Sequence, residues 1–298
     1  MLIDSITNFS NQEYSRQDTE HICVNCNHSG NCPGNCKTCL KEIHYPAEYP
    51  AGKKDYDCPN LINFYVCDYT FKYASEIWYL LKQSQVIKTM DEYKIVSIGC
   101  GACPDLMAFE SYLIEQNISK SISYIGIDKN ELWEPVHNEI KRYDNANIKT
   151  KFFYHDAFDL FKRKKASSQN ILVLQYVISH LYNTEQITKL HQLYNDLISN
   201  IVLYKESGKP FVILINDVNS NRRGRDYFEM LCKKLTEANL HGCYSKYYFD
   251  YNIICDLQRF GTKHESTNIL YSIPPAFKKY QPWMECSSAQ MIIEIYGD

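Results

Sequence analysis

The sequence predicts an α/β protein in which a mostly parallel β-sheet is covered by helices on both faces. From residue 93 to the end, apolar strand-like runs alternate with amphipathic helical patterns, as expected when crossover helices join parallel strands. Before residue 69 the chain has clustered cysteines and little periodicity. This pattern indicates a small module that needs a cross-link, such as a bound metal, to hold its fold. We therefore expect a cysteine-rich module (1–68), a linking helix (69–92) and an α/β domain (93–298).

The composition is typical of a soluble globular protein, with 45% hydrophobic and 22% charged residues. A net charge of −3 gives no general case for a nucleic-acid partner. No apolar run approaches the ~18 residues that a membrane-spanning helix needs, and the N-terminus has no basic region followed by an apolar core. We expect a cytoplasmic protein without membrane contact.

Cysteines gather near the N-terminus, and five of the thirteen lie between Cys23 and Cys39. Without a secretion signal, such clustering favours metal binding over disulfides. Short turns with C-x-x-C spacing aim two sulfurs at one ion, and a tetrahedral set of thiolates is typical of structural zinc. We expect one or two zinc ions, held by ligands drawn from six candidates: Cys23, Cys26, Cys32, Cys36, Cys39 and Cys58.

Two other interpretations of these cysteines stay open, namely reduced structural cysteines without metal and an iron–sulfur cluster. The C-x-x-x-C-x-x-C run from Cys32 to Cys39 resembles the radical S-adenosylmethionine motif, but that family is a (β/α) barrel and the downstream spacing does not belong to it. Residues 1–70 hold more acidic than basic side chains. This balance disfavours nucleic-acid binding by the module and favours support of the fold, a substrate mouth or docking of a protein partner.

The segments before the α/β domain give one clear helix. Residues 1–20 are polar and are expected to be poorly ordered. Residues 69–88 predict a helix that Asp68 or Thr70 could cap. Its apolar positions fall on one face: Phe71, Ala74, Ile77, Trp78 and Leu81.

The most informative stretch runs from Ile95 to Asp105, where an apolar strand ends in Gly99-Cys-Gly101 and a helix begins. Glycines let such a turn pass close to a ligand without a Cβ clash. Pro104 suits the first helical position, where a missing N–H costs nothing. The pattern predicts a strand, a tight ligand-binding turn and a helix over 104–117.

A second strand, Ile122–Ile127, ends in Asp128, which is placed to accept hydrogen bonds from ribose hydroxyls. A dinucleotide site would share this layout. Its G-x-G-x-x-G fingerprint fails here, however, because Pro104 stands at the third glycine position.

Together these segments resemble class I S-adenosylmethionine-dependent methyltransferases. A third run (150–154) leads into His155-Asp156-Ala157, and runs at 170–176 and 210–216 complete the order of the family's strands. The resemblance covers residues 93–298 and departs from the family at Cys103, where many members have glycine. It implies a Rossmann-like sheet that ends in an antiparallel pair of strands. The runs at 244–256 and 289–296 would form this pair, and residues 257–288 would be an insertion between them. Further helices are expected over 131–142, 184–205 and 223–239.

The same resemblance implies the residues that bind S-adenosylmethionine. Gly99 and Gly101 would lie under the methionine part, with Asp105 in the same pocket. Asp128 would hold the ribose. Asp156 and Ala157 would contact the adenine, and Gln175 would line the rest of the cofactor pocket.

The methyl acceptor is not named by the sequence. The segment after the fourth strand, Gln175–His180, has neither the Asp/Asn-Pro-Pro-aromatic nor the Pro-Cys pattern of nucleic-acid methylases, so DNA is disfavoured. Tyr176 or His180 is expected to orient or deprotonate the nucleophile. RNA, protein and small molecules stay open. Basic clusters lie at Lys162–Lys165 and Arg222–Arg225, and an RNA acceptor would engage the second through Arg222, Arg223 and Arg225.

A rival interpretation is a non-catalytic interaction protein. It would keep a degenerate cofactor-binding fold and use the zinc module to dock a partner. Cys103 in the glycine turn leaves this alternative open, and binding of S-adenosylmethionine would separate the two.

Overall fold

A computed structural model gives the fold of most of the chain. It describes residues 1–19, 35–143, 145–162, 169–204, 208–220, 223–250 and 259–296. The strands are β1 (Tyr93–Ile98), β2 (Ile122–Ile127), β3 (Ile148–Phe153), β4 (Ile171–Gln175), β5 (Phe211–Val218), β6 (Gly242–Tyr248), β7 (Thr262–Lys263) and β8 (Ser288–Ile295).

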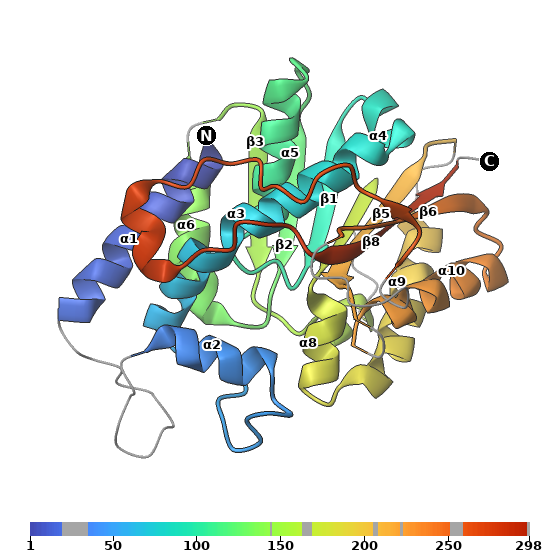
Figure 1. Ribbon diagram of the computed structural model, residues 1–298. Helices are drawn as coiled ribbons and strands as arrows, with labels where there is room; N and C mark the ends of the chain where they lie inside the picture. The colour runs from blue at the N-terminus through green and yellow to red at the C-terminus, as the bar shows by residue number, and fades with distance from the viewer. Residues whose placement is uncertain are drawn as a thin grey trace.

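In this part of the chain, the eight strands form one sheet in the order β3-β2-β1-β4-β5-β8-β6-β7. Strands β1 to β5 pair in parallel, whereas β8 runs antiparallel between β5 and β6 (Figure 1). The expected fold class is therefore confirmed, including the antiparallel pair near the C-terminus. Asp128 follows β2 and Tyr176 follows β4, so both come to the carboxyl edge of the sheet, where open α/β sheets bind ligands.

Helices account for most of the remaining described chain. They are α1 (Leu2–Thr19), α2 (Cys36–His44), α3 (Pro59–Gln83), α4 (Gln85–Thr89), α5 (Pro104–Glu115), α6 (Glu134–Arg142), α7 (Ala157–Lys162), α8 (Val177–Asn183), α9 (Leu190–Tyr204) and α10 (Phe228–Glu237). Short 3₁₀ turns include η1 (Glu131–Trp133), η2 (Ile187–Lys189), η3 (Arg225–Tyr227) and η5 (Pro275–Tyr280).

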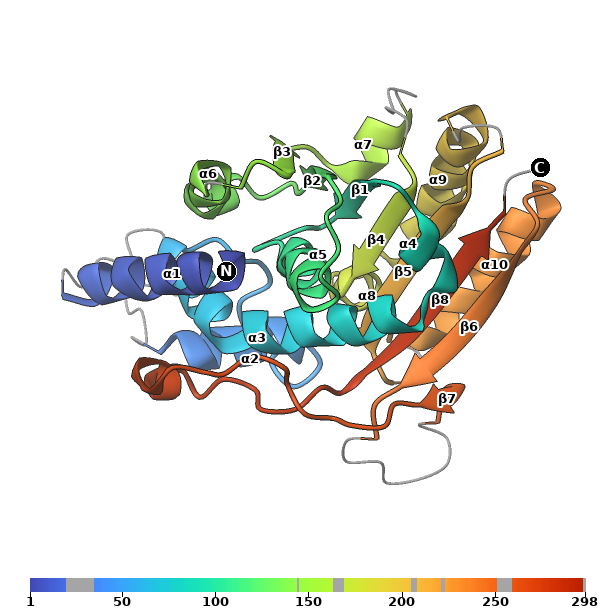
Figure 2. The ribbon, with the colours of Figure 1, turned by 90° about the horizontal axis from the view of Figure 1, so that it is seen from above.

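Two apolar cores lie on opposite faces of the sheet because successive strand side chains alternate in direction. On β1, Ile95 belongs to the core beneath α1 to α6, and its neighbour Val96 belongs to the core beneath α7 to α10. Figure 2 shows α3 and α5 on one side of the sheet and α9 and α10 on the other. The helices before residue 93 thus share the first core with the α/β domain.

The first helix corrects one expectation, because residues 2–19 form α1 rather than a poorly ordered tail. Leu2, Ile3 and Ile6 are at most 1% exposed. The backbone N–H of Leu2 also donates to Glu110 Oε2 at 2.7 Å. Phe9 and Tyr14 also pack against this core, so α1 docks through a set of apolar side chains on a helix that is otherwise mostly polar.

Two predicted helices begin elsewhere. Helix α3 starts at Pro59 rather than at residue 69, so it crosses the expected boundary between the module and the linking helix; proline suits the first turn. Helix α9 starts at Leu190 rather than at Thr184. Glu185 has a φ of +59°, and this left-handed residue separates α9 from the shorter α8.

No helix in the described residues is both long and apolar enough to cross a bilayer.

Candidate active site

A cavity of about 330 Å³ lies at the carboxyl edge of the sheet. Its walls come from the segments after β1 to β4 and from α2, α3 and α8. The structure brings together there eight residues predicted from the sequence: Gly99, Gly101, Asp128, Asp156, Ala157, Gln175, Tyr176 and His180.

The glycine turn after β1 is tied to the acid after β2. Gly99 and Gly101 have φ values of +61° and +48°, a region that L side chains rarely adopt. The N–H of Gly101 donates to Asp128 Oδ2 at 3.0 Å, and the N–H of Asn130 donates to Oδ1 at 2.9 Å. Burial raises the pKa of Asp128, while these two bonds oppose that shift. The carboxylate is thus held at the cavity wall.

Asp105, which was expected in the same pocket, does not line the cavity. It is 1% exposed behind the turn and accepts a hydrogen bond from the Tyr124 hydroxyl at 2.9 Å. As the second residue of α5, its side chain turns into the protein interior. Burial raises its pKa to about 7. The expectation that Asp105 lies in the same pocket as Gly99 and Gly101 is therefore corrected, because Asp105 is not among the residues that line the described cavity.

The segment after β3 forms the start of α7. Asp156 Oδ1 accepts a hydrogen bond from the N–H of Phe158 at 2.9 Å, so Asp156 caps this helix. Ala157 is its first residue. Gln175, at the end of β4, donates from Nε2 to the Tyr73 carbonyl at 2.9 Å, and its Oε1 is buried without a hydrogen-bond partner in the described structure.

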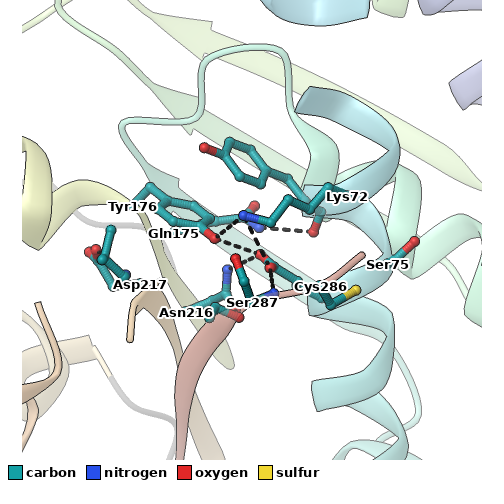
Figure 3. Close-up of polar contacts among 12 residues, drawn as sticks. Lys72, Ser75, Gln175, Tyr176, Asn216, Asp217, Cys286 and Ser287 are labelled. Carbon is teal, nitrogen blue, oxygen red and sulfur yellow. Dashed lines mark hydrogen bonds and ion pairs between the residues drawn. The ribbon is translucent and has the colours of Figure 1, made fainter. Parts of the chain in front are cut away.

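Tyr176 lies in a strained and tightly bonded position between β4 and α8. Its φ is +56°, uncommon for a bulky residue and frequent at functional sites. The ring stacks on Tyr73 with centroids 4.1 Å apart. Its hydroxyl donates to Glu76 Oε2 at 2.8 Å and receives a hydrogen bond from Lys72 Nζ at 3.2 Å; Figure 3 shows Lys72 and Tyr176 pointing toward one another.

Burial and the neighbouring Glu76 carboxylate raise the pKa of Tyr176 well above its ordinary value. The phenol therefore stays protonated at neutral pH. Of the two roles expected for Tyr176, this chemistry fits orientation of a ligand rather than removal of a proton.

His180, one turn further along α8, has the properties of a proton acceptor. Burial lowers its pKa, so the imidazole is neutral at neutral pH. The ring lines the cavity, and no hydrogen bond to it occurs within the described residues. Helix α8 is fixed at its start by Asp217, which accepts from the N–H groups of Ile178 and Ser179 at 2.9 and 3.1 Å.

One face of α3 forms a wall of the cavity that the sequence analysis missed. The apolar face predicted for this helix packs on the core, and the opposite face carries Tyr65, Tyr69, Lys72 and Tyr73 into the cavity. The sequence does carry a signal for this wall, because Tyr65, Tyr69 and Tyr73 repeat every four residues, the spacing that places side chains on one face of a helix. The side chain of Lys72 lies over three aromatic rings, those of Tyr73, Tyr176 and Trp283.

Helix α2 also contributes a histidine that was not expected in this cavity. His44 Nδ1 lies 3.1 Å from the Tyr69 hydroxyl, and Nε2 lies 2.9 Å from the Tyr56 hydroxyl. Burial lowers the pKa of His44 to about 4. The described wall of this part of the cavity is thus built from neutral imidazoles and protonated phenols.

The predicted metal ligands are described only in part. Cys36 and Cys39 lie in the first turn of α2, where a spacing of three residues places both thiols on one helix face. Cys58 is the N-cap residue of α3. Cys23, Cys26 and Cys32 lie outside the described residues.

The structure describes two of the three arginines that an RNA acceptor was expected to engage. Arg223 lines the cavity, but Arg225 is 4% exposed and donates from Nη1 to Asn219 Oδ1 at 2.9 Å. Arg225 is therefore not placed to contact a phosphate. Arg222 lies outside the described residues, as does most of Lys162–Lys165.

In comparisons with known proteins, no family model and no curated protein matches the chain. Among solved structures, the chain is similar to the plantazolicin methyltransferase BpumL bound to SAH (14% identity, 88% of this chain and 97% of that chain, TM-score 0.46). It is also similar to a putative class I S-adenosylmethionine-dependent methyltransferase from Listeria monocytogenes (11% identity, 88% and 68%, TM-score 0.40).

Proposed function

We propose that this protein is an S-adenosylmethionine-dependent methyltransferase. One observation carries the proposal: a single cavity holds the glycine turn, the acid after β2 and the acid after β3, facing a wall of phenols and a neutral histidine. The first group fits a nucleoside with a methionine tail, as the resemblance to class I methyltransferases implies. The second group fits an acceptor that must be oriented and deprotonated.

The cofactor would supply an electrophilic methyl group, and the protein would position the acceptor in line with it. Gly99 and Gly101 would let the backbone approach the methionine part. Asp128 would accept hydrogen bonds from the ribose. Gln175 Oε1, buried without a described partner, would accept a hydrogen bond from a bound N–H or O–H group. His180 would take the proton from the acceptor.

Asp128 offers the direct test of the cofactor site. Asp128→Ala is expected to weaken S-adenosylmethionine binding by about 1–3 kcal/mol, because ribose hydroxyls would be left unpaired. Isothermal titration calorimetry measures the change. Asp91→Ala is the control, since Asp91 is exposed and precedes β1 at the opposite edge of the sheet. Equal affinity in the wild type and a folded Asp128→Ala protein would remove Asp128 from the site.

We further propose that the N-terminal cysteines hold at least one structural zinc ion. Three of the candidate thiols support this proposal: Cys36 and Cys39 share a helix face, and Cys58 is the N-cap residue of the neighbouring α3. Thiolates are preferred zinc ligands. Freshly purified protein is expected to contain zinc, and Cys36→Ser/Cys39→Ser is expected to contain less by elemental analysis. Iron as the only metal, or an unchanged zinc content in the double variant, would contradict this assignment.

The acceptor is best matched by a small molecule or a single protruding side chain. The cavity is walled by aromatic side chains on α3, and apolar, aromatic linings with few polar groups are typical of small-molecule sites. Burial of Arg225 removes one of the three contacts that an RNA acceptor would have used.

A further inference from the structure

A second cluster of metal-ligand side chains lies behind the glycine turn. Cys100 and Cys103 come from the turn itself, and His137 comes from α6. Their ligand atoms all lie within 4.8 Å of one another. The three residues are 4%, 0% and 0% exposed, respectively. The methyl-transfer chemistry proposed above uses none of these side chains.

We propose that Cys100, Cys103 and His137 bind a structural zinc ion that braces the glycine turn. Around tetrahedral zinc, a sulfur and a nitrogen ligand lie about 3.6 Å apart and two sulfurs about 3.8 Å apart. Cys100 Sγ lies 3.8 Å from His137 Nε2. Only small movements would therefore bring these atoms to bonding distance of one ion.

The imidazole is already held in the orientation that a metal ligand needs. The ring of Phe152 stacks on His137 with centroids 4.0 Å apart and planes 7° apart. The Tyr154 hydroxyl lies 3.0 Å from Nδ1. Nε2 itself donates a hydrogen bond to the Gly101 carbonyl oxygen at 2.7 Å, so a bound ion would take the place of the Nε2 proton while Nδ1–H donates to Tyr154, the arrangement usual for histidine ligands. Gly126 makes room, because a Cβ there would lie 2.8 Å from Cys100 Sγ.

A carbonyl oxygen and a buried acid lie beside the three candidate ligands. The Gly101 carbonyl oxygen accepts hydrogen bonds from His137 Nε2 at 2.7 Å and from the Cys103 thiol at 3.8 Å, and a bound ion would take the place of these two protons. The Tyr124 hydroxyl bonds Asp105 Oδ1 and also interacts with the Cys103 thiol.

The remaining oxygen of that acid, Asp105 Oδ2, is buried and has no hydrogen-bond partner in the described structure. Tyr124 thus links this acid to the Cys103 thiol, one of the three proposed ligands. Because all three ligands are buried, no position is open to a substrate, and the ion's role would be structural.

Elemental analysis of the full chain tests the proposal. Cys100→Ser/Cys103→Ser is expected to lose one zinc ion per chain relative to the wild type. The matched control is Cys232→Ser/Cys243→Ser, which removes two thiols from α10 and β6 and is expected to keep the full zinc content. An unchanged zinc content in a folded Cys100→Ser/Cys103→Ser protein would overturn the site, as would a Cys100–Cys103 disulfide found by mass spectrometry in the freshly purified wild type.

A spectroscopic measurement covers the case in which the double variant fails to fold. X-ray absorption at the zinc edge of the wild type is expected to show nitrogen or oxygen ligands besides sulfur, and His137→Gln is expected to reduce the nitrogen signal. Sulfur ligands alone in the wild type, or an identical spectrum for His137→Gln, would refute the assignment. Neither readout depends on methyl transfer, so failure here leaves the proposed activity untouched.

Discussion

Replacing Glu76 by alanine is expected to lower the free energy of unfolding by about 3–5 kcal/mol, the effect of removing one partner from a buried charge pair. Glu76 is 0% exposed. It accepts hydrogen bonds from the Tyr176 hydroxyl (2.8 Å), Asn216 Nδ2 (3.1 Å) and the Ser287 N–H (2.9 Å). Lys72 Nζ lies 3.6 Å from Glu76 Oε1, so the alanine variant would leave the ammonium of Lys72 without its carboxylate partner and three hydrogen-bond donors unpaired.

Chemical denaturation measures this loss of stability, and two further variants serve as comparisons. Glu76→Gln keeps the shape and one acceptor and is expected to lose less. Glu237→Ala removes an exposed acid from a 4.0 Å surface pair and is expected to change stability by less than about 1 kcal/mol. A Glu76→Ala protein as stable as Glu237→Ala would show that this network does not hold α3 against the sheet.

His180→Ala is expected to lower kcat by roughly 10²–10⁴-fold, the usual contribution of a general base, with cofactor affinity unchanged. Transfer of labelled methyl groups from S-adenosylmethionine to components of a cell extract supplies the assay while the acceptor is being identified. Burial lowers the pKa of His180. The neutral base therefore persists to below pH 6.5, and the wild-type rate should fall only as the pH drops through that lowered pKa.

His191→Ala provides the control, because His191 is exposed on α9. It should leave both the rate and its pH profile unchanged. A folded His180→Ala protein with the wild-type rate, or one that keeps the acid limb of the profile, would assign the proton transfer to another group.

Local sequence patterns correctly predicted the boundaries of some strands and helices and the residues that follow the parallel strands. The strand Ile122–Ile127 matches β2 at both ends, because an apolar run followed by an aspartate leaves little choice of boundary. Helix α5 begins at Pro104, as the proline indicates. Residues placed at the ends of successive parallel strands converge for the same reason, since the sheet brings those ends to one edge.

The remainder depends on contacts between distant segments. Helix α1 is stabilised by docking against α3, α5 and α6, which no local pattern reveals. The left-handed turns at Tyr176 and Glu185 place α8 where the sequence suggested only the end of a strand. The tyrosine face of α3 looks like a solvent-exposed face until the chain before it is known to close over the carboxyl edge of the sheet.

Calorimetric titration of the wild-type protein with S-adenosylmethionine and S-adenosylhomocysteine is the direct test of the proposed cofactor site. We expect saturable binding of both ligands at one site per chain, since they share the adenine, ribose and methionine groups that the cavity is proposed to hold. Absence of binding by either ligand to folded protein would contradict it and would favour an interaction protein that keeps only the shape of the fold.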